Sequence, residues 1–327
     1  MGLSAIFGLV EADFERVNRL IPRQLCSGVD LVEEIGRYIV EAGGKRLRPL
    51  IVLLIVRAFA KAYPGGRADD PIRLATIIEF LHTATLLHDD VVDKSARRRG
   101  RATANALWGN APSVLVGDFL YSRGFQLMVE LDNMDIMAII SDATNVIAEG
   151  EVMQLANVGR ADVTEAEYLE VVRRKTAMLF QAAAHTGAVL CCDDPDPIDS
   201  LRRYGLHFGM AYQLVDDWLD YAGDGRVMGK NPGDDLAEGK VTLPLIHTMA
   251  HGRATDGTLV RQAIAGRSAG DFARVADAVQ RSGGLAYTKS RALEAADRAM
   301  EEALVLPPSP YRDALEALAE FAVSRMA

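Results

Sequence analysis

Residues 70–93 read DPIRLATIIEFLHTATLLHDDVVD, and the pattern of this stretch decides the fold. An Asp-Pro pair opens it, which is typical of a helix start, because aspartate caps the first turn and proline fits the first helical position. Apolar side chains then recur every three or four residues, at Leu74, Ile77, Ile78 and Leu81, which is the period of one helix face. The stretch therefore predicts one long helix that ends in a cluster of aspartates.

Two further long helices are predicted downstream. The capping box Thr164-x-x-Glu167 begins one of them, which runs toward Val189. The other begins at Asp196, directly before a proline, and ends near Gly223. Strand-like alternation is scarce, and most glycines fall between the helical segments. The sequence thus predicts an all-α protein, with helices long enough to wall a deep cavity.

The composition indicates an ordinary globular chain. Its 327 residues are 49% hydrophobic and 25% charged, which is typical of a soluble globular protein rather than a disordered or fibrous one. The net charge of −9 argues against a nucleic-acid partner, because neutralising phosphates requires a basic surplus. No linker, low-complexity block or repeat divides the chain. We therefore predict a single domain over residues 1–327, a large helical bundle around a deep central cavity.

Cysteine usage and hydropathy predict the compartment. Cys26, Cys191 and Cys192 form neither a disulfide framework nor a zinc-ligand pattern, so a reducing, cytoplasmic setting is expected. The longest apolar run, 50–56, is too short to span a bilayer. Acidic residues near the start replace the positive charge of a signal peptide. We expect neither a membrane span nor an export signal.

Two acidic motifs carry the chemistry. The first long helix ends in Asp-Asp-x-x-Asp, and the same motif returns late in the third. Carboxylates four residues apart share a helix face and repel each other by a few tenths of a kcal/mol, so clusters in apolar surroundings require a counter-charge. Oxygen ligands of this kind suit Mg²⁺, which uses one or two carboxylates together with waters and substrate phosphate. The predicted metal ligands are Asp89, Asp90, Asp93, Asp216, Asp217 and Asp220.

Basic clusters supply the matching cations for a phosphorylated ligand. They lie in GGKRLRP (43–49), in KSARRRGR (94–101) and in the Gly-rich segment 223–240. Arginine binds phosphate through two parallel hydrogen bonds and lysine adds a point charge. A diphosphate could therefore be bound between Mg²⁺ ions held by the carboxylates on one side and arginine and lysine side chains on the other. The segment 223–240 has the composition of a mobile active-site lid, and equally that of a solvated connector.

An apolar stripe lies behind the first motif. Stepping back from the leading aspartate along its helix face meets Thr85, His82 and Ile78, with Leu81 and Ala84 to the sides. No aromatic residue intrudes on this face. Such a stripe predicts a channel for a hydrocarbon tail, although plain helix packing would give the same pattern.

These features resemble one known family. Over nearly its whole length the chain is similar to the trans-polyprenyl diphosphate synthases, and most similar to bacterial octaprenyl-type, long-chain members. Both acidic motifs in order, with the intervening pieces at proper distances, make the resemblance highly specific. The matching segments are GGKRLRP (43–49), HTATLLHDDVVD (82–93), RRGRATAN (98–105), LVGDFL (115–120), EGEVMQL (149–155), KT (175–176), YQLVDDWLDY (212–221) and GKNPGDDLAEGKVTLPL (229–245).

The resemblance implies a reaction and its residues. An allylic diphosphate such as farnesyl diphosphate would ionise on Mg²⁺, with three ions per active site, and the double bond of isopentenyl diphosphate would attack the cation. The implied catalytic residues are Asp89, Asp93, Lys175, Asp216 and Lys230. Those implied to bind the allylic diphosphate are Arg98, Lys175, Thr176, Gln213, Lys230 and Lys240. Those implied to bind isopentenyl diphosphate are Lys45, Arg48, His82 and Arg99.

The resemblance also bears on product length and assembly. In this family a bulky aromatic four or five positions before the leading aspartate stops elongation early, and Thr85 and Ala84 stand there. A channel lined by Leu81, Ala84 and Thr85 therefore implies a long, octaprenyl-like product, of the kind used for quinone side chains. A geranylgeranyl or farnesyl product is the alternative. A homodimer and a transient membrane contact for product release are also expected.

Three other functions fit parts of the sequence. A di-iron bundle would use Glu79-x-x-His82, but it needs a second such pair, and no other histidine has a glutamate three positions before it. A non-catalytic regulatory subunit should lack part of an acidic motif or of the basic set, whereas this sequence has both acidic motifs and the lysines 175, 230 and 240. A terpene cyclase does not need the second diphosphate site that GGKRLRP and Arg99 provide. The roles of His88, Asp234 and Asp235 stay open.

Overall fold

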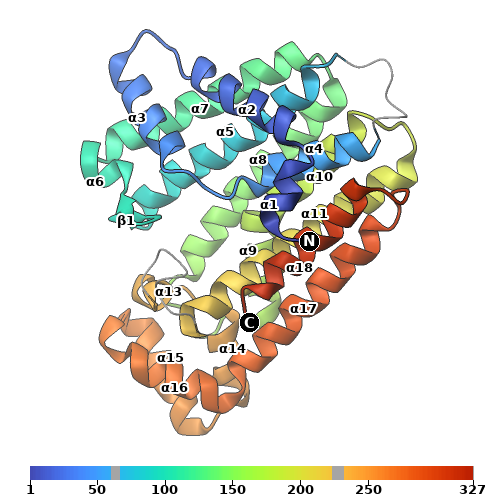
Figure 1. Cartoon of the computed structure of the whole chain (residues 1–327). Helices are drawn as coiled ribbons and strands as arrows, with labels where there is room; N and C mark the ends of the chain where they lie inside the picture. The colour runs from blue at the N-terminus through green and yellow to red at the C-terminus, as the bar shows by residue number, and fades with distance from the viewer. Residues whose placement is uncertain (60–66, 223–231, 327) are drawn as a thin grey trace. The chain divides into compact units, whose positions relative to one another are not determined.

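The computed structural model describes residues 1–59, 67–222 and 232–326, which are almost entirely helical (Figure 1). Within this part of the chain the only strands are β1 (Arg97–Arg98) and β2 (Arg101–Ala102), which pair antiparallel. The all-α prediction is confirmed. None of the helices in the described ranges is both long enough and apolar enough to cross a membrane.

Contacts divide the chain into two compact units, each built from three segments. The first unit comprises residues 1–142, 179–205 and 302–318, and the second comprises residues 143–178, 206–301 and 319–327. The boundaries at residues 142 and 205 fall inside helices α8 and α11. The two units are described separately below, and the single domain stays a prediction.

The first unit is built around α4 and α5. In α4 the residues from Leu50 to Ile55 are all buried, because the helix is apolar on every side and is surrounded by other elements. Helix α5 packs against α2, α4 and α7. The elements of this unit are α1 (Leu3–Gly8), α2 (Glu11–Gln24), α3 (Asp30–Glu41), α4 (Leu47–Ala58), α5 (Asp70–Val92), α6 (Ala104–Trp108), α7 (Asn110–Leu131), the start of α8 (Met134–Asn157), most of α10 (Met178–Val189), and the starts of α11 (Pro195–Ala222) and α18 (Pro310–Ser324).

Helix α5 follows its sequence prediction closely. It starts with Pro71 in the first turn and extends to Val92. The N-cap is Asp69, one residue earlier than predicted, and it makes no side-chain capping bond. Beyond the last helical residue, the backbone N–H of Asp93 donates to the carbonyl of Asp89 at 2.8 Å, so the first acidic motif keeps helical geometry throughout.

The second unit has two apolar cores. One joins α9, α11, α14 and α17 and includes Tyr168, Leu214 and Met326, and the other joins α14, α15 and α16 around Val260 and Val275. Burial of these side chains, at about 1.5–3 kcal/mol each, holds the unit together. Its elements are the end of α8, α9 (Glu165–Val172), a π-helical turn (Arg173–Ala177), the end of α11, α13 (Asp234–Glu238), α14 (Leu243–His251), α15 (Ala254–Gly266), a 3₁₀ turn (Ala269–Asp271), α16 (Phe272–Ser282), α17 (Gly284–Ala303) and the end of α18.

The predicted helix from Thr164 toward Val189 is present but interrupted. The capping box is complete, with the Thr164 hydroxyl accepting from the Glu167 backbone N–H and the Glu167 carboxylate accepting from that of Thr164. A π-helical turn at 173–177 then separates α9 from α10. Such turns are rare and occur often at functional sites. The third predicted helix is confirmed as α11.

Candidate active site

The first acidic motif presents two faces at the end of α5. Asp89 and Asp93 are one turn apart on the same face, and both are half-buried. Asp90 lies on another face and is fully buried, with its Oδ1 accepting from Nε of Arg98 at 2.8 Å. Burial raises the pKa of Asp90, and the charge of Arg98 opposes the shift. The structure thus pairs the middle aspartate with an arginine and leaves the other two on a separate face.

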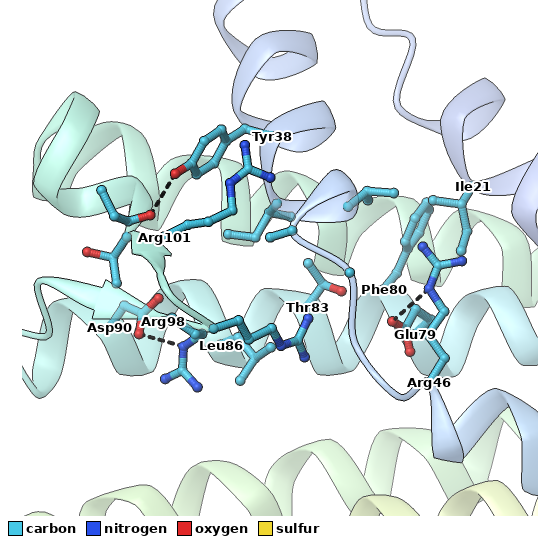
Figure 2. A pocket seen from close by; sticks show the side chains of 17 residues that line it. Ile21, Tyr38, Arg46, Glu79, Phe80, Thr83, Leu86, Asp90, Arg98 and Arg101 are labelled. Atoms are coloured by element: carbon cyan, nitrogen blue, oxygen red, sulfur yellow. Dashed lines mark hydrogen bonds and ion pairs between the residues drawn. The ribbon is translucent and has the colours of Figure 1, made fainter. Parts of the chain in front are cut away.

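The β1–β2 hairpin is tied to this helix end. The side-chain amide of Asn105 donates to the carbonyl of Asp90 at 3.1 Å, and the hydroxyl of Thr103 donates to the carbonyl of Ser95 at 2.6 Å. On the other side, the hydroxyl of Tyr38 donates to the carbonyl of Ala102 at 2.8 Å (Figure 2). These bonds fix the loop that carries the arginines of RRGR.

The GGKRLRP loop meets the hairpin through its second glycine. Gly44 has a φ of +153°, and a Cβ added there would lie 2.6 Å from Nη1 of Arg99. The Arg99 guanidinium therefore lies directly against the loop backbone, which only glycine allows. Lys45 is exposed in the same loop, and the Arg48 guanidinium stacks 3.9 Å from the ring centre of Phe180.

Electrostatics mark this region as an anion site. Burial lowers the pKa of His82 well below its usual range, and the charges of Arg48, Arg99 and Arg98 lower it further, so its imidazole is neutral. Burial raises the pKa of Glu79, while nearby arginines oppose the shift. A cluster of arginines around one carboxylate and a neutral imidazole attracts a multiply charged anion.

A cavity runs along α5 beside this cluster. Figure 2 shows Arg46 beside Glu79 at one end and Arg98 beside Asp90 at the other, with Thr83 between them. The Arg46 Nε lies 3.8 Å from the Glu79 carboxylate. This positive environment repels metal ions, which argues against the di-iron alternative.

The predicted channel residues lie on the inner part of α5. Leu81 and Ala84 are buried, and Thr85 is half-buried with its hydroxyl donating to the carbonyl of His82 at 2.8 Å. A Cβ added at Gly124 of α7 would lie 3.6 Å from Cδ2 of Leu81. The small residues predicted to keep the channel open are thus interior positions of the first unit.

His88 packs against α7. Its ring is parallel to that of Tyr121 at 6.2 Å, its Nε2 lies 3.2 Å from the carbonyl oxygen of Val114, and a Cβ added at Gly117 would overlap it at 2.3 Å. These contacts give His88 a packing role between two helices.

In the second unit, the three aspartates of the second motif have different partners. Nη2 of Arg325 donates to Oδ1 of Asp216 at 2.6 Å, and its guanidinium stacks 4.9 Å from the ring centre of Tyr212. The Asp216 side chain is 40% exposed, whereas Asp217 and Asp220 are buried. Arg325 therefore supplies a positive charge at the most accessible carboxylate of the motif.

Asp217 is the centre of a buried hydrogen-bond network. The Tyr168 hydroxyl donates to its Oδ2 at 2.5 Å, and the side-chain amide of Gln213 donates to its Oδ1 at 2.6 Å. The Thr176 hydroxyl donates in turn to Oε1 of Gln213 at 2.9 Å. Burial, together with the charge of Asp235, raises the pKa of Asp217 to about 7. The network joins two residues predicted to bind diphosphate to the middle aspartate.

The described part of the predicted lid, residues 232–240, lies at the second motif. The backbone N–H of Gly233 donates to Oδ1 of Asp220 at 3.1 Å, and that of Lys240 donates to the carbonyl of Asp235 at 2.8 Å. The ammonium of Lys240 lies 2.6 Å from the carboxylate of Glu238. Lys230, a predicted catalytic residue, lies outside the described residues, as does the rest of 223–231, the first half of the Gly-rich segment.

The π-helical turn positions Lys175. Its ammonium lies 2.6 Å from the carboxylate of Glu151 and donates to Oε1 of Gln154 at 2.6 Å, so the EGEVMQL and KT motifs meet. Gly150 makes the approach possible, because a Cβ there would lie 2.7 Å from the backbone nitrogen of Lys175. The lysine is half-buried and oriented by both partners.

The donors present fit Mg²⁺. In the described ranges, no group of three or more Asp, Glu, His or Cys side chains could hold a metal ion by itself. Magnesium does not require such a group, because it keeps several waters and takes one or two carboxylates together with substrate phosphate. Asp89 and Asp93 on one face of α5, and Asp216 on α11, are carboxylates of the required kind. The two motifs belong to different units, and their meeting stays a prediction.

Sequence reasoning missed several partners of the site residues. Tyr168, Arg325, Gln154 and Glu151 each hold a predicted residue by a direct contact. Glu151 and Gln154 belong to EGEVMQL, one of the segments that carry the family resemblance, so the sequence did mark them as candidate site residues. Nothing comparable marked Tyr168 or Arg325, which look like an ordinary core tyrosine and surface arginine.

The chain is similar to known proteins over nearly its whole length. A family model described as polyprenyl synthetase matches residues 29–281. Octaprenyl diphosphate synthase of Escherichia coli (strain K12) is 48% identical over 326 residues, which is 99% of each chain. A polyprenyl synthase from Caulobacter crescentus CB15, crystallised with calcium and isoprenyl diphosphate, superposes with a TM-score of 0.92 at 44% identity, covering 100% of this chain and 98% of that one. A decaprenyl diphosphate synthase structure from Rhodobacter capsulatus gives a TM-score of 0.93 at 40% identity, covering 100% of both chains.

Proposed function

The chain belongs to the polyprenyl synthetase family, and from this premise we propose that it condenses isopentenyl diphosphate with an allylic diphosphate to make a long-chain, all-trans polyprenyl diphosphate. It is a prenyltransferase. The observation that carries the proposal is a pair of sites: in the first unit Arg99 and Arg48 are held against Gly44 and Phe180, and in the second unit the second acidic motif is hydrogen-bonded to Gln213, a predicted diphosphate-binding residue.

The first unit would bind isopentenyl diphosphate. Lys45, Arg48 and Arg99 would pair with its diphosphate, and the neutral His82 would donate a hydrogen bond. The close approach of Arg99 to Gly44 and the stacking of Arg48 on Phe180 support this role, because both fix the guanidinium groups before the ligand arrives. Preorganised donors of this kind bind an anion with little loss of side-chain entropy.

The allylic diphosphate would be held by the remaining basic and polar groups. These are Arg98, Lys175, Thr176, Gln213, Lys230 and Lys240. Of the six predicted metal ligands, Asp89, Asp93, Asp216 and Asp220 would hold Mg²⁺, with three ions per site; we leave out Asp90, which pairs with Arg98, and Asp217, which Tyr168 and Gln213 hold. Bound Mg²⁺ supplies Lewis-acid stabilisation of the departing diphosphate. The chain's own groups orient both substrates so that C4 of isopentenyl diphosphate faces C1 of the allylic group. The C1–O bond breaks, the new C–C bond forms, and the released diphosphate takes the C2 proton.

The small residues on α5 support a long product. Ala84 and Thr85 stand where a large aromatic residue would close the channel, and the chain is similar to an octaprenyl and a decaprenyl diphosphate synthase. A short-chain product is the alternative.

The direct test is an assay of the purified chain with Mg²⁺, radiolabelled isopentenyl diphosphate and farnesyl diphosphate. Extracted lipids are dephosphorylated and sized by reversed-phase chromatography. Long polyprenols support the proposal in full, and C15 to C20 alcohols support the reaction but not the chain length. Absence of any condensation product at saturating substrate would contradict the proposed function.

Gly44→Ala tests the isopentenyl diphosphate site. The added methyl group displaces the Arg99 guanidinium, and the loss of one charge-assisted contact should raise the KM for isopentenyl diphosphate about tenfold, with the KM for the allylic substrate unchanged. Gly43→Ala is the matched control, because Gly43 also has a positive φ of 70° but an added Cβ there meets nothing within 4 Å. Equal KM values for the two variants would remove Arg99 from this role.

A homodimer through α8 is also part of the proposal. Seven exposed residues follow the 4-3 spacing of a coiled-coil seam along this helix. The three large apolar side chains among them are 77% (Met134), 67% (Val152) and 60% (Leu155) exposed. A second copy of the same helix is the natural occupant, because a symmetric dimer uses one self-complementary stripe. The seam residues are Met134, Ala138, Ser141, Asn145, Ala148, Val152 and Leu155.

Val152→Glu should convert the dimer into a monomer. Two carboxylates would be buried in the seam without partners, which costs more than a surface contact can offset. Light scattering after size-exclusion chromatography should give twice 35.5 kDa for the parent and 35.5 kDa for the variant. Leu304→Glu, at a residue that is 57% exposed elsewhere, should leave the mass unchanged. A monomeric parent, or a dimeric variant, would contradict the α8 interface.

A further inference from the structure

We propose that Asp217 is a positioning residue rather than a metal ligand, and that with Tyr168 and the Thr176 hydroxyl it fixes the Gln213 amide for the allylic diphosphate. The inference rests on the proposed function, because it assigns the parts of the same site. It adds Tyr168 to the residues that the reaction needs.

Both carboxylate oxygens of Asp217 are engaged by the chain itself. Oδ2 accepts from the Tyr168 hydroxyl at 2.5 Å, and Oδ1 accepts from Nε2 of Gln213 at 2.6 Å. The residue is 3% exposed, and Tyr168 is 6% exposed. Each oxygen keeps a second lone pair, but at this degree of burial a hydrated cation could reach it only by moving Tyr168 or Gln213 aside, and a buried donor without a partner costs about 1–3 kcal/mol. Asp216, next along α11, has a side chain that is 40% exposed, and only its Oδ1 accepts from Arg325, a charged group that water can solvate when a cation replaces it.

The ionised form of Asp217 also decides which way the Gln213 amide points. A flipped amide would place its oxygen against the carboxylate, so Nε2 must face Asp217 and Oε1 must face Thr176. Nε2 carries two hydrogens, and the one not directed at Asp217 can be offered to a diphosphate oxygen. The Thr176 hydroxyl is held in the π-helical turn next to Lys175. The network therefore leaves one N–H of the Gln213 amide for the diphosphate, while the only hydrogen of the Thr176 hydroxyl is directed at Oε1 of Gln213.

Asparagine and alanine at position 217 separate the two roles. In Asp217→Asn, the side-chain oxygen can accept from Gln213 and the amide can donate to the Tyr168 oxygen, so the network survives without the charge. In Asp217→Ala both hydrogen bonds of the network are lost. A metal ligand, in contrast, would be lost equally in both variants, because an amide does not neutralise a divalent cation.

The first measurement is a titration with Mn²⁺ in the presence of saturating inorganic diphosphate. Electron paramagnetic resonance reports how much Mn²⁺ is bound. We expect Asp217→Asn to keep the parent's Mn²⁺ affinity within about threefold, whereas Asp216→Asn should weaken it by about tenfold or more. A loss in Asp217→Asn as large as that in Asp216→Asn would overturn the proposal.

The second measurement is steady-state kinetics of Tyr168→Phe. Removing the hydroxyl should raise the KM for the allylic diphosphate about tenfold while the KM for isopentenyl diphosphate stays the same, a split that general destabilisation would not produce. Tyr287→Phe is the matched control, because the Tyr287 hydroxyl donates to Glu165 in the same unit and is not part of the site. Equal allylic KM values for Tyr168→Phe and Tyr287→Phe would also overturn the proposal.

Failure of this inference is distinguishable from failure of the proposed function. A parent chain that condenses the two diphosphates, together with an Asp217→Asn variant that loses Mn²⁺, rejects the positioning role alone. A parent chain that forms no condensation product rejects the function, and the Mn²⁺ titration then still reports whether Asp217 binds metal.

Discussion

Replacing Asp216 by alanine should lower turnover about a thousandfold, the largest effect expected of any single substitution in this chain. Two physical losses add up in this variant. The most exposed carboxylate of the second motif is removed, and Arg325, whose Nη2 lies 2.6 Å from it, keeps its positive charge where a cation should bind. Steady-state kinetics at saturating Mg²⁺ and substrates measure the effect. Asp89→Ala should behave alike, because Asp89 lies on the half-buried face of the first motif.

A suitable control is Asp162→Ala in the same unit. The Asp162 side chain is 76% exposed and pairs with Arg160 at the surface, so its loss should leave turnover unchanged. Thermal unfolding of each variant should be measured alongside turnover, to check that the fold is intact. Turnover of Asp216→Ala or Asp89→Ala within a few-fold of the parent would mean that these carboxylates do not hold the metal.

Ala84→Phe should change the product rather than the rate of the first condensation. Ala84 is fully buried on α5, five positions before Asp89, and a benzyl group there would block an elongating chain. The main product should shift from long polyprenyl chains to short ones of a few isoprene units. Chromatographic sizing of the dephosphorylated products, with each substrate at saturation, measures the shift.

Overpacking has to be separated from channel blocking in this experiment. A phenylalanine forced into a filled core costs about 1–3 kcal/mol, whatever the function of the position. Ala75→Phe is the matched control, since Ala75 is equally buried on α5 but lies nine residues earlier, on the opposite face. The control should lose stability and keep the parent's product length. Product of unchanged length from a folded Ala84→Phe variant would show that Ala84 does not line the channel.

Much of the helical structure could be predicted because its signals are local. The capping box at Thr164, the proline at the start of α5 and the apolar spacing through Leu81 all act within a turn or two of chain. Residue type likewise predicted that the aspartates of both motifs require cations and that GGKRLRP supplies them. The N-cap of α5 was misplaced by one residue, because two aspartates precede the proline and the sequence does not say which one lies outside the helix.

The partners of these residues could not be predicted in the same way. The six aspartates look equivalent in the sequence, yet Asp90 pairs with Arg98, Asp216 with Arg325, and Asp217 with Tyr168. The π-helical turn at 173–177 was also unforeseen. This turn packs against Gly150 of α8, where a Cβ added to the glycine would lie only 2.7 Å from the Lys175 backbone nitrogen. The turn is therefore in close contact with another helix, which the local sequence does not reveal.

The amino-acid sequence by itself determined that the chain is helical, that it carries two acidic motifs and three basic clusters, and that those groups suit Mg²⁺ and a phosphorylated ligand; the reaction was implied by the family resemblance. The reason is that helical period, capping and charge are properties of neighbouring residues. Only the tertiary structure decided what each aspartate does, because Tyr168 and Arg325 come from 49 and 109 residues away along the chain to meet their carboxylates. Burial and hydrogen-bond partners at such separations arise from packing, and they make chemically identical side chains unequal.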